Sequence, residues 1–126
     1  MREILFRGKG NPKYNTGEWY EGYLRQDSEG DFQICGSCWS RTVIPETVGQ
    51  YTGVCDKNGA KIFEGDIINV YRPFDKIKTN AVVQWNGIFS SFSVGDCGTL
   101  FGGAVADVYE IVGNIHDNPE LLVGAE

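Results

Sequence analysis

Two carboxylates, Glu64 and Asp66, lie two residues apart in the middle of the chain. On a β-strand this spacing would point both side chains to the same face, where they could bind a cation or share a proton. General acid–base catalysis would also require burial and a substrate pocket, and the sequence indicates neither. We therefore expect no catalytic residues in this chain.

The polar residues around this pair could instead line a groove for a ligand. The candidate ligand-binding residues are Tyr51, Asp56, Asn58, Glu64 and Asp66. A purely structural interpretation competes with this one, because Asp, Asn and Gly are the residues that tight turns require. In particular, the DKNG segment at residues 56–59 predicts a hairpin with a type I′ turn at Asn-Gly. From the sequence alone, both interpretations stay open.

Cysteines supply the other reactive groups. Cys35 and Cys38 have the CxxC spacing of zinc knuckles and redox dithiols, whereas Cys55 and Cys97 stand alone. A zinc ribbon needs a second close pair, and a redox pair usually opens a helix, whereas this one lies in glycine- and serine-rich sequence between strands. We expect ordinary reduced thiols, no metal and no cofactor. A metal site with borrowed ligands and a redox site are the alternatives.

The charge of the chain bears on polyanionic partners. The formal net charge is −6, which disfavours binding to the phosphate backbone of nucleic acid. A local basic group at the N-terminus, with Arg2, Arg7 and Lys9, is the candidate nucleic-acid contact. Aromatic residues make up 13% of the chain, and aromatics on small barrels often stack bases. Nucleic-acid binding is therefore kept as an alternative.

The elements that must position these residues are β-strands. Glycine occurs 17 times in 126 residues, and short β-branched and aromatic runs alternate with Gly, Asn and Asp turns. We predict a mainly β fold, with a β-rich α+β arrangement as the alternative. Residues 1–45 would form an N-terminal β meander, and residues 46–126 an SH3-like small barrel, together making one compact unit.

The C-terminus is predicted to end in a short helix. Asn118 can cap it, and Pro119 suits its first position. Leu121 and Leu122 are apolar, so we expect one of them to pack back onto the barrel near residues 114–115.

The sequence also bears on membrane insertion, secretion and self-association of the protein. No apolar run approaches the roughly 18 residues that a membrane span requires, and charged residues interrupt the first apolar stretch, so we expect neither a membrane segment nor a signal peptide. A small β protein leaves strand edges exposed, and these edges favour a homo-oligomer.

Three parts of the sequence resemble the YopX family of phage and prophage proteins. They are MREILFRG at residues 1–8, the middle motifs TVGQYTG, DKNG and IFEGDI at residues 47–53, 56–59 and 62–67, and YEIVGNIHDNPELL at residues 109–122. The resemblance spans both termini. It implies a small β-rich protein in the cytoplasm of a bacterial host, and it supplies no catalytic residues.

These observations lead to two competing functions. The absence of a catalytic constellation favours a non-enzymatic phage or prophage accessory protein that acts through a protein partner. The alternative is a nucleic-acid-associated module of phage replication or regulation.

Overall fold

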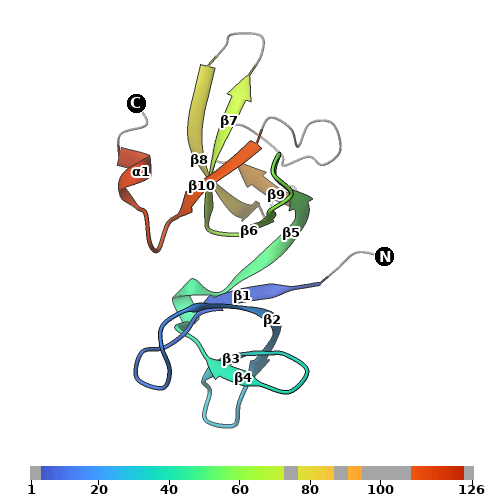
Figure 1. The fold of residues 1–126 in the computed structure, drawn as a ribbon, viewed down its shortest axis with the longest axis vertical. Coiled ribbons are helices and arrows are strands. Elements are labelled where there is room, and N and C mark those ends of the chain that lie inside the picture. Colours follow the sequence, from blue (N-terminus) through green and yellow to red (C-terminus); the bar gives the residue numbers. More distant parts are fainter. Residues whose placement is uncertain (1–3, 73–76, 87–90, 95–108, 124–126) are drawn as a thin grey trace. The chain divides into compact units, whose positions relative to one another are not determined.

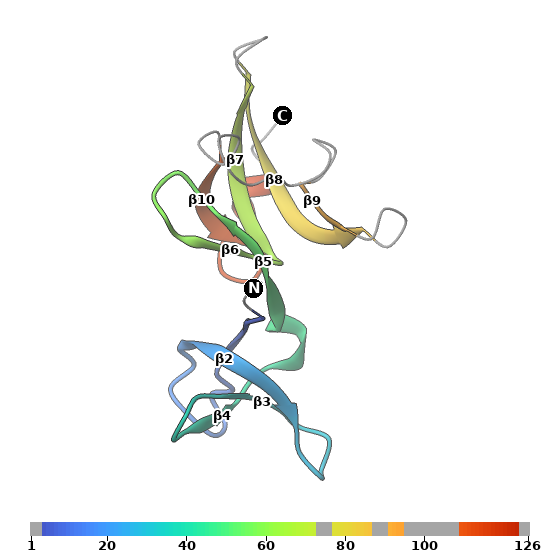
Figure 2. The same cartoon turned by 90° about the vertical axis from the view of Figure 1, so that its right-hand side faces the viewer.

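The computed structural model describes residues 4–72, 77–86, 91–94 and 109–123. Over these ranges the chain forms ten β-strands, one 3-10 turn and one short helix, and the strands assemble into two antiparallel sheets (Figures 1 and 2). The prediction of a mainly β fold is confirmed. Within the same ranges, no helix is long and apolar enough to cross a membrane.

The chain divides into two compact units, Met1–Tyr51 and Thr52–Glu126, which we call unit 1 and unit 2. The passage from one to the other falls inside a single strand, β5 (Gly49–Cys55). The division after residue 45 and the SH3-like character of the C-terminal part stay predictions.

Unit 1 is built on a curled antiparallel sheet. In spatial order its strands are β4 (Ser40–Thr42), β3 (Phe32–Cys35), β2 (Trp19–Gln26), β1 (Phe6–Lys9) and the first part of β5. A bridge between Gly10 and Val43 joins the chain just after β1 to the chain just after β4. The sheet therefore closes on itself, and the 3-10 turn η1 (Pro45–Thr47) leads on to β5.

The core of unit 1 lies on the inner face of this sheet. Ile34 and Val43 are 0% and 1% exposed, and burial of such a side chain stabilises the fold by roughly 1.5–3 kcal/mol. Gly22 on β2 lies beside the end of the paired strand β3, and a Cβ atom there would overlap the carbonyl oxygen of Cys35. Glycine at this position thus permits a close approach of the two backbones.

Unit 2 contains a four-stranded sheet and the hairpin that enters it. The sheet order is β10 (Tyr109–Asn114), β7 (Asp66–Arg72), β8 (Ile77–Asn86) and β9 (Ser91–Val94), and β6 (Lys61–Phe63) neighbours the later part of β5. Strands β8 and β9 pair with each other, and residues 87–90 between them lie outside the described residues.

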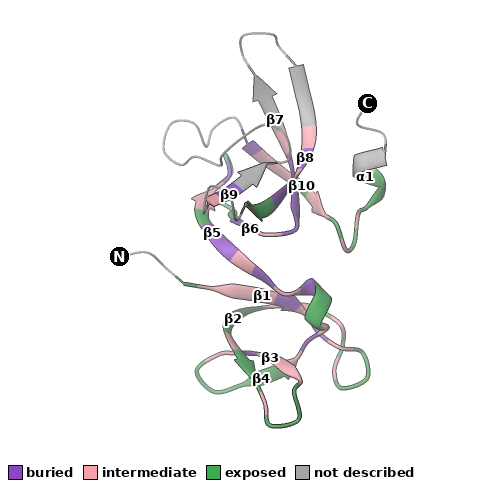
Figure 3. Ribbon diagram, turned by 180° about the vertical axis from the view of Figure 1, so that it is seen from behind, coloured by how far each residue is buried: buried purple, intermediate pink, exposed green. Residues whose placement is uncertain are grey.

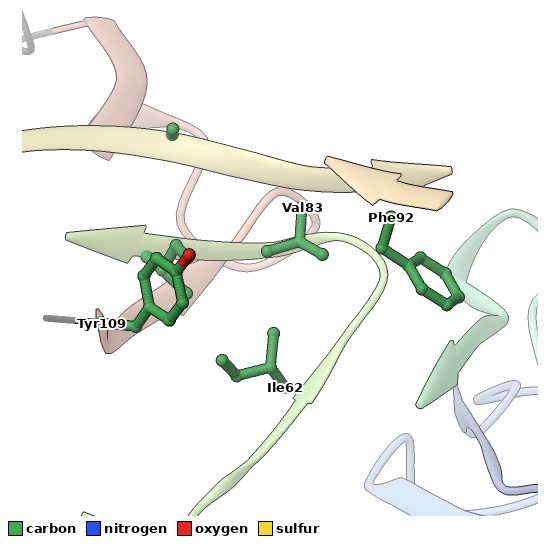
Figure 4. Packing of buried hydrophobic residues seen from close by; sticks show 6 residues of the cluster. Ile62, Val83, Phe92 and Tyr109 are labelled. Carbon is green, nitrogen blue, oxygen red and sulfur yellow. The ribbon is translucent and has the colours of Figure 1, made fainter. Parts of the chain in front are cut away.

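One apolar cluster holds unit 2 together. Its buried members, which Figure 4 draws as sticks, are Ile62, Ile68, Ala81, Val83, Phe92 and Tyr109. They come from β6 and from all four strands of the sheet, so the β5–β6 hairpin packs onto the face of that sheet. Figure 3 shows that most buried positions lie in strands, whereas turns are mostly exposed.

The terminal helix α1 (Glu120–Val123) forms where the sequence predicts it and contacts β8. The Asn80 amide nitrogen donates to the Leu121 carbonyl oxygen at 3.2 Å, and the Asn69 amide nitrogen donates to Asn80 Oδ1 at 2.9 Å. Leu121 is half-buried. A chain of asparagines on neighbouring strands therefore fixes the helix to the sheet.

Candidate functional site

The turn between β5 and β6 is organised by the side chain of Asp56. Its Oδ1 accepts hydrogen bonds from the backbone amides of Asn58 at 2.9 Å and Ala60 at 3.0 Å. The amide of Asp56 donates to the Ala60 carbonyl at 2.8 Å, and the amide of Gly59 donates to the Asp56 carbonyl at 3.0 Å. These bonds enclose a three-residue loop with Gly59 at a φ of 84°.

The predicted type I′ turn is therefore wrong in its geometry, although the hairpin is present. A type I′ turn would close between residues 57 and 60, whereas this turn closes between 56 and 60. Only the last loop residue needs a left-handed backbone here, as in three-residue hairpin loops that end in a glycine bulge. The Asp56 carboxylate selects this form, because its Oδ1 can reach the amides two and four residues ahead.

The same carboxylate fastens the turn to β10. Asp56 Oδ2 accepts the amide of Ile111 at 3.1 Å, and the Lys57 amide donates to the Tyr109 carbonyl at 3.0 Å. At the surface, Lys57 Nζ lies 3.5 Å from a Glu110 carboxylate oxygen. The β10 strand is an edge of its sheet within the described part of the chain, so these contacts supply that edge with partners.

Electrostatics keep Asp56 ionised. Burial raises the pKa of this carboxyl, but the amides of Ile111, Ala60 and Asn58 and the charge of Lys57 lower it, and the net pKa lies below the usual value for aspartate. Asp56 is 6% exposed. An ionised, enclosed carboxylate that accepts three amides can hold a turn, but it is badly suited to donate a proton.

The second pair of candidate residues, Glu64 and Asp66, belongs to the connection between β6 and β7. Glu64 and Gly65 form a turn, and Gly65 has a φ of 88°. Asp66 is 1% exposed, and its Oδ2 accepts the amide of Phe63 at 2.8 Å. The two carboxylates are therefore not successive same-face residues of one strand, because the turn reorients the chain between them.

The remaining predicted ligand-binding residues are separated. Tyr51 is buried in unit 1, where its amide donates to the Leu5 carbonyl at 2.7 Å. Asn58 is exposed at the tip of the Asp56 turn in unit 2. The binding of a ligand by these residues stays a prediction.

The predicted nucleic-acid residues are placed as follows. Arg2 lies outside the described residues. Arg7 on β1 stacks its guanidinium 4.8 Å from the ring centroid of Trp19. Lys9 is half-buried, and its amide donates to Thr47 Oγ1 at 2.9 Å. Arg7 and Lys9 alternate with the inward-facing Gly8, so both belong to the outer face of the sheet.

Sequence reasoning missed a cluster of aromatic and cationic side chains in unit 1. The rings of Tyr20 and Trp39 have centroids 5.8 Å apart and an angle of 48° between their planes. The guanidinium of Arg41 lies 5.8 Å from the centroid of each ring. The Trp-x-Arg spacing directly after the CxxC was the available signal, but nothing in the sequence indicated that Tyr20 joins it.

The cysteines add no cluster of ligands within the described residues. Cys35 is half-buried at the end of β3, Cys38 is exposed in the following turn, and neither forms a disulfide. Over those residues, no group of three or more His, Cys, Asp or Glu side chains is placed to hold a metal ion. Cys97 lies outside the described ranges.

Comparison with known proteins gives a family and a fold. The model of the family described as YopX protein matches residues 11–123. Among solved structures, the chain is similar to the crystal structure of protein EF1440 from Enterococcus faecalis, with 28% sequence identity and a TM-score of 0.62. That similarity covers 97% of this chain and 99% of the other. No curated protein matches the chain.

Proposed function

Because this chain belongs to the YopX family, we propose that it is a non-enzymatic phage or prophage accessory protein. It acts by binding a partner protein in the cytoplasm of its bacterial host. The observation that supports this most is the use of its carboxylates in the fold. Asp56 accepts three backbone amides, and Asp66 accepts the amide of Phe63. Carboxylates engaged in this way are poorly suited to bind a substrate or to exchange protons with it.

An exposed aromatic residue is the best anchor for such a partner. Tyr23 on β2 is 69% exposed, and its neighbours Glu21 and Arg25 on the same face are exposed as well. An aromatic side chain surrounded by charged residues is the usual composition of an interface hot spot and its polar rim. We assign Tyr23 this role.

Co-purification tests the proposal. A tagged chain is expressed in bacteria that carry the phage, and the captured protein is then purified and titrated against the wild type by calorimetry. Tyr23→Ser should weaken binding about tenfold or more, as removal of an aromatic hot spot does. The control Trp85→Ser, which removes a half-exposed aromatic from unit 2, should bind normally.

Two results would contradict this function. One is the failure to recover any stoichiometric partner. The other is turnover of a substrate by the purified chain, with loss of that turnover in Glu64→Gln or Asp66→Asn.

A second copy of the chain is a further partner that we propose. Among the strands that the structure describes, β9 is at an edge of the unit 2 sheet, and edge strands offer backbone groups to another chain. Light scattering should give at least twice the chain mass of 14.0 kDa, and a value of 14.0 kDa at high concentration would contradict a homo-oligomer.

A nucleic-acid-associated module is the second candidate function. The residues predicted from the sequence to contact nucleic acid are Arg2, Arg7 and Lys9. Of these, Arg7 is stacked on Trp19. The cluster around Arg41 supports this function better, because it brings one exposed cation and two aromatic rings together.

A further inference from the structure

The cluster of Tyr20, Trp39 and Arg41 lies at one end of the unit 1 sheet. Tyr20 is near the start of β2, Trp39 directly precedes β4, and Arg41 is in the middle of β4 (Figures 1 and 2). Arg41 and Trp39 are both exposed. A guanidinium beside two aromatic rings can form cation–π contacts while its outer side stays open to solvent.

Close packing holds both rings of this cluster in place. The Gly36 amide donates to the Trp39 carbonyl at 2.9 Å, and a Cβ atom on Gly36 would overlap the Trp39 indole. A Cβ atom on Gly10 would lie 2.9 Å from the ring of Tyr20, whose hydroxyl is 3.4 Å from Thr16 Oγ1. The rings are therefore preorganised, which lowers the entropy that a ligand stacking on them would have to remove.

A second aromatic–cation pair lies on the neighbouring loop. Tyr14 is 56% exposed, and Lys13 Nζ lies 5.4 Å from the centroid of its ring. The loop is attached beside β4, because the amide of Asn11 and the side-chain amide of Asn15 both donate to the Thr42 carbonyl at 2.9 Å. Unit 1 thus presents two ring–cation pairs on adjacent segments.

Acidic residues of unit 1 gather at the other end of its sheet. Asp27, Glu29 and Asp31 belong to the turn between β2 and β3. That turn is six or more residues along β2 from Tyr20, about 20 Å at 3.3 Å per residue. Near the cluster the exposed acids are Glu18 and Glu21, against the three cations Arg7, Lys13 and Arg41, and Arg7 is the cross-strand partner of Glu21. The end that carries the rings is therefore locally positive although the chain is acidic overall.

We propose that this end of unit 1 binds single-stranded nucleic acid, an inference that rests on the second candidate function and gives it a site. Bases stack on Tyr14 and Trp39, and phosphates are bound by Lys13 and Arg41. Exposed rings alternating with cations match the alternation of bases and phosphates along a single strand. An acidic peptide would use the cations and leave the ring faces empty. A duplex keeps its bases stacked internally, and the net charge of −6 disfavours its denser phosphates.

Fluorescence anisotropy with a labelled thymidine 12-mer tests the site. The wild type should bind at low salt, with a dissociation constant that rises with salt at a log–log slope of about 1.4, the value for two phosphate contacts on a single strand. Tyr14→Ser and Arg41→Gln should each weaken binding about tenfold, within the range for loss of one stacked base or one close charge. The control Arg25→Gln removes the same charge at the acidic end and should change binding less than twofold.

The possible results distinguish a failure of this binding site from a failure of the second candidate function. The wild type is first tested at 20 mM salt and ~1 mM protein, a concentration at which even nonspecific binding to nucleic acid would be detected. If it does not bind the 12-mer there, both the site and the second candidate function are overturned. Binding that Arg25→Gln weakens as much as Arg41→Gln overturns the site alone. Displacement of the 12-mer by an equal concentration of a polyglutamate peptide shows that the occupant is acidic protein, which also overturns it. Tyr14 is exposed on a loop, so its variant remains informative if Arg41→Gln does not fold.

Discussion

The Asp56 side chain provides the sharpest test of how unit 2 is stabilised. In Asp56→Asn, one side-chain oxygen can still accept the amides of Asn58 and Ala60, but an NH2 group replaces Oδ2 and faces the Ile111 amide. The variant therefore loses a charge-assisted bond and leaves the Ile111 amide without an acceptor. Each such effect costs about 1–3 kcal/mol, so we expect the free energy of unfolding to fall by about 2–3 kcal/mol at pH 7.

A matched control exists in unit 1. The turn between β2 and β3 has the same geometry, because Asp27 Oδ1 accepts the amides of Glu29 at 2.9 Å and Asp31 at 3.0 Å. No third amide is bound to Asp27 in the described residues. Asp27→Asn keeps both bonds and should cost less than about 1 kcal/mol, since Asn serves well in such turns.

The lowered pKa of Asp56 determines how its contribution to stability changes with pH. The pKa of Asp56 is lowered in the folded chain, so its ionisation contributes stability above the unfolded pKa of about 3.9 and loses that contribution as the pH falls through the folded value. The difference between wild type and Asp56→Asn should therefore be full at pH 7 and shrink in strong acid. Urea unfolding at several pH values measures it, and amide exchange at Ile111 reports the lost bond locally.

Equal costs for Asp56→Asn and Asp27→Asn would refute this reasoning, because the third amide is what separates the two turns. A difference that stays constant down to pH 2 would refute the electrostatic part.

Other expected outcomes concern backbone fit and the C-terminus. Gly22→Ala should cost about 3 kcal/mol or more, because its methyl group would overlap a carbonyl of the neighbouring strand, whereas Gly59→Ala has open space and should cost about 1–2 kcal/mol from its left-handed backbone alone. Thermal unfolding of both variants measures the contrast, and a larger cost at Gly59 would contradict it. Truncation after Asn118 removes the acceptor of the Asn80 amide and the half-buried Leu121, and should lower the melting temperature by several degrees. An unchanged melting temperature would show that α1 contributes nothing to stability.

Strand content and turn positions were accessible from the sequence because they depend on local chemistry. The alternation of β-branched and aromatic runs with glycine turns predicts a mainly β chain, and the hairpin at Asp56–Gly59 lies where the sequence places it. The type of the 56–60 turn was not accessible. Asn58-Gly59 alone favours type I′, but the Asp56 side chain two residues earlier changes the closing pair.

The contacts that define the candidate sites are long-range, and no local pattern records them. Asp56 and Ile111 are 55 residues apart, and their bond exists only because β10 passes beside the β5–β6 hairpin. The meeting of Tyr20 with Trp39 likewise requires the β3–β4 turn to fold toward the start of β2. Contacts of this kind follow from strand order, which periodicity and turn signals leave undetermined.

In this chain, the polar groups that support the fold are different from those that are available to bind a partner. Near the middle motif, the carboxylates of Asp56 and Asp66 accept backbone amides and so stabilise turns and a sheet edge. In unit 1, by contrast, the Arg41 guanidinium is exposed and lies beside aromatic rings. Groups that the fold has already satisfied have little interaction energy left for a ligand, whereas exposed rings and cations retain theirs. Recognition by this protein should therefore depend on its aromatic and basic residues far more than on its acidic ones.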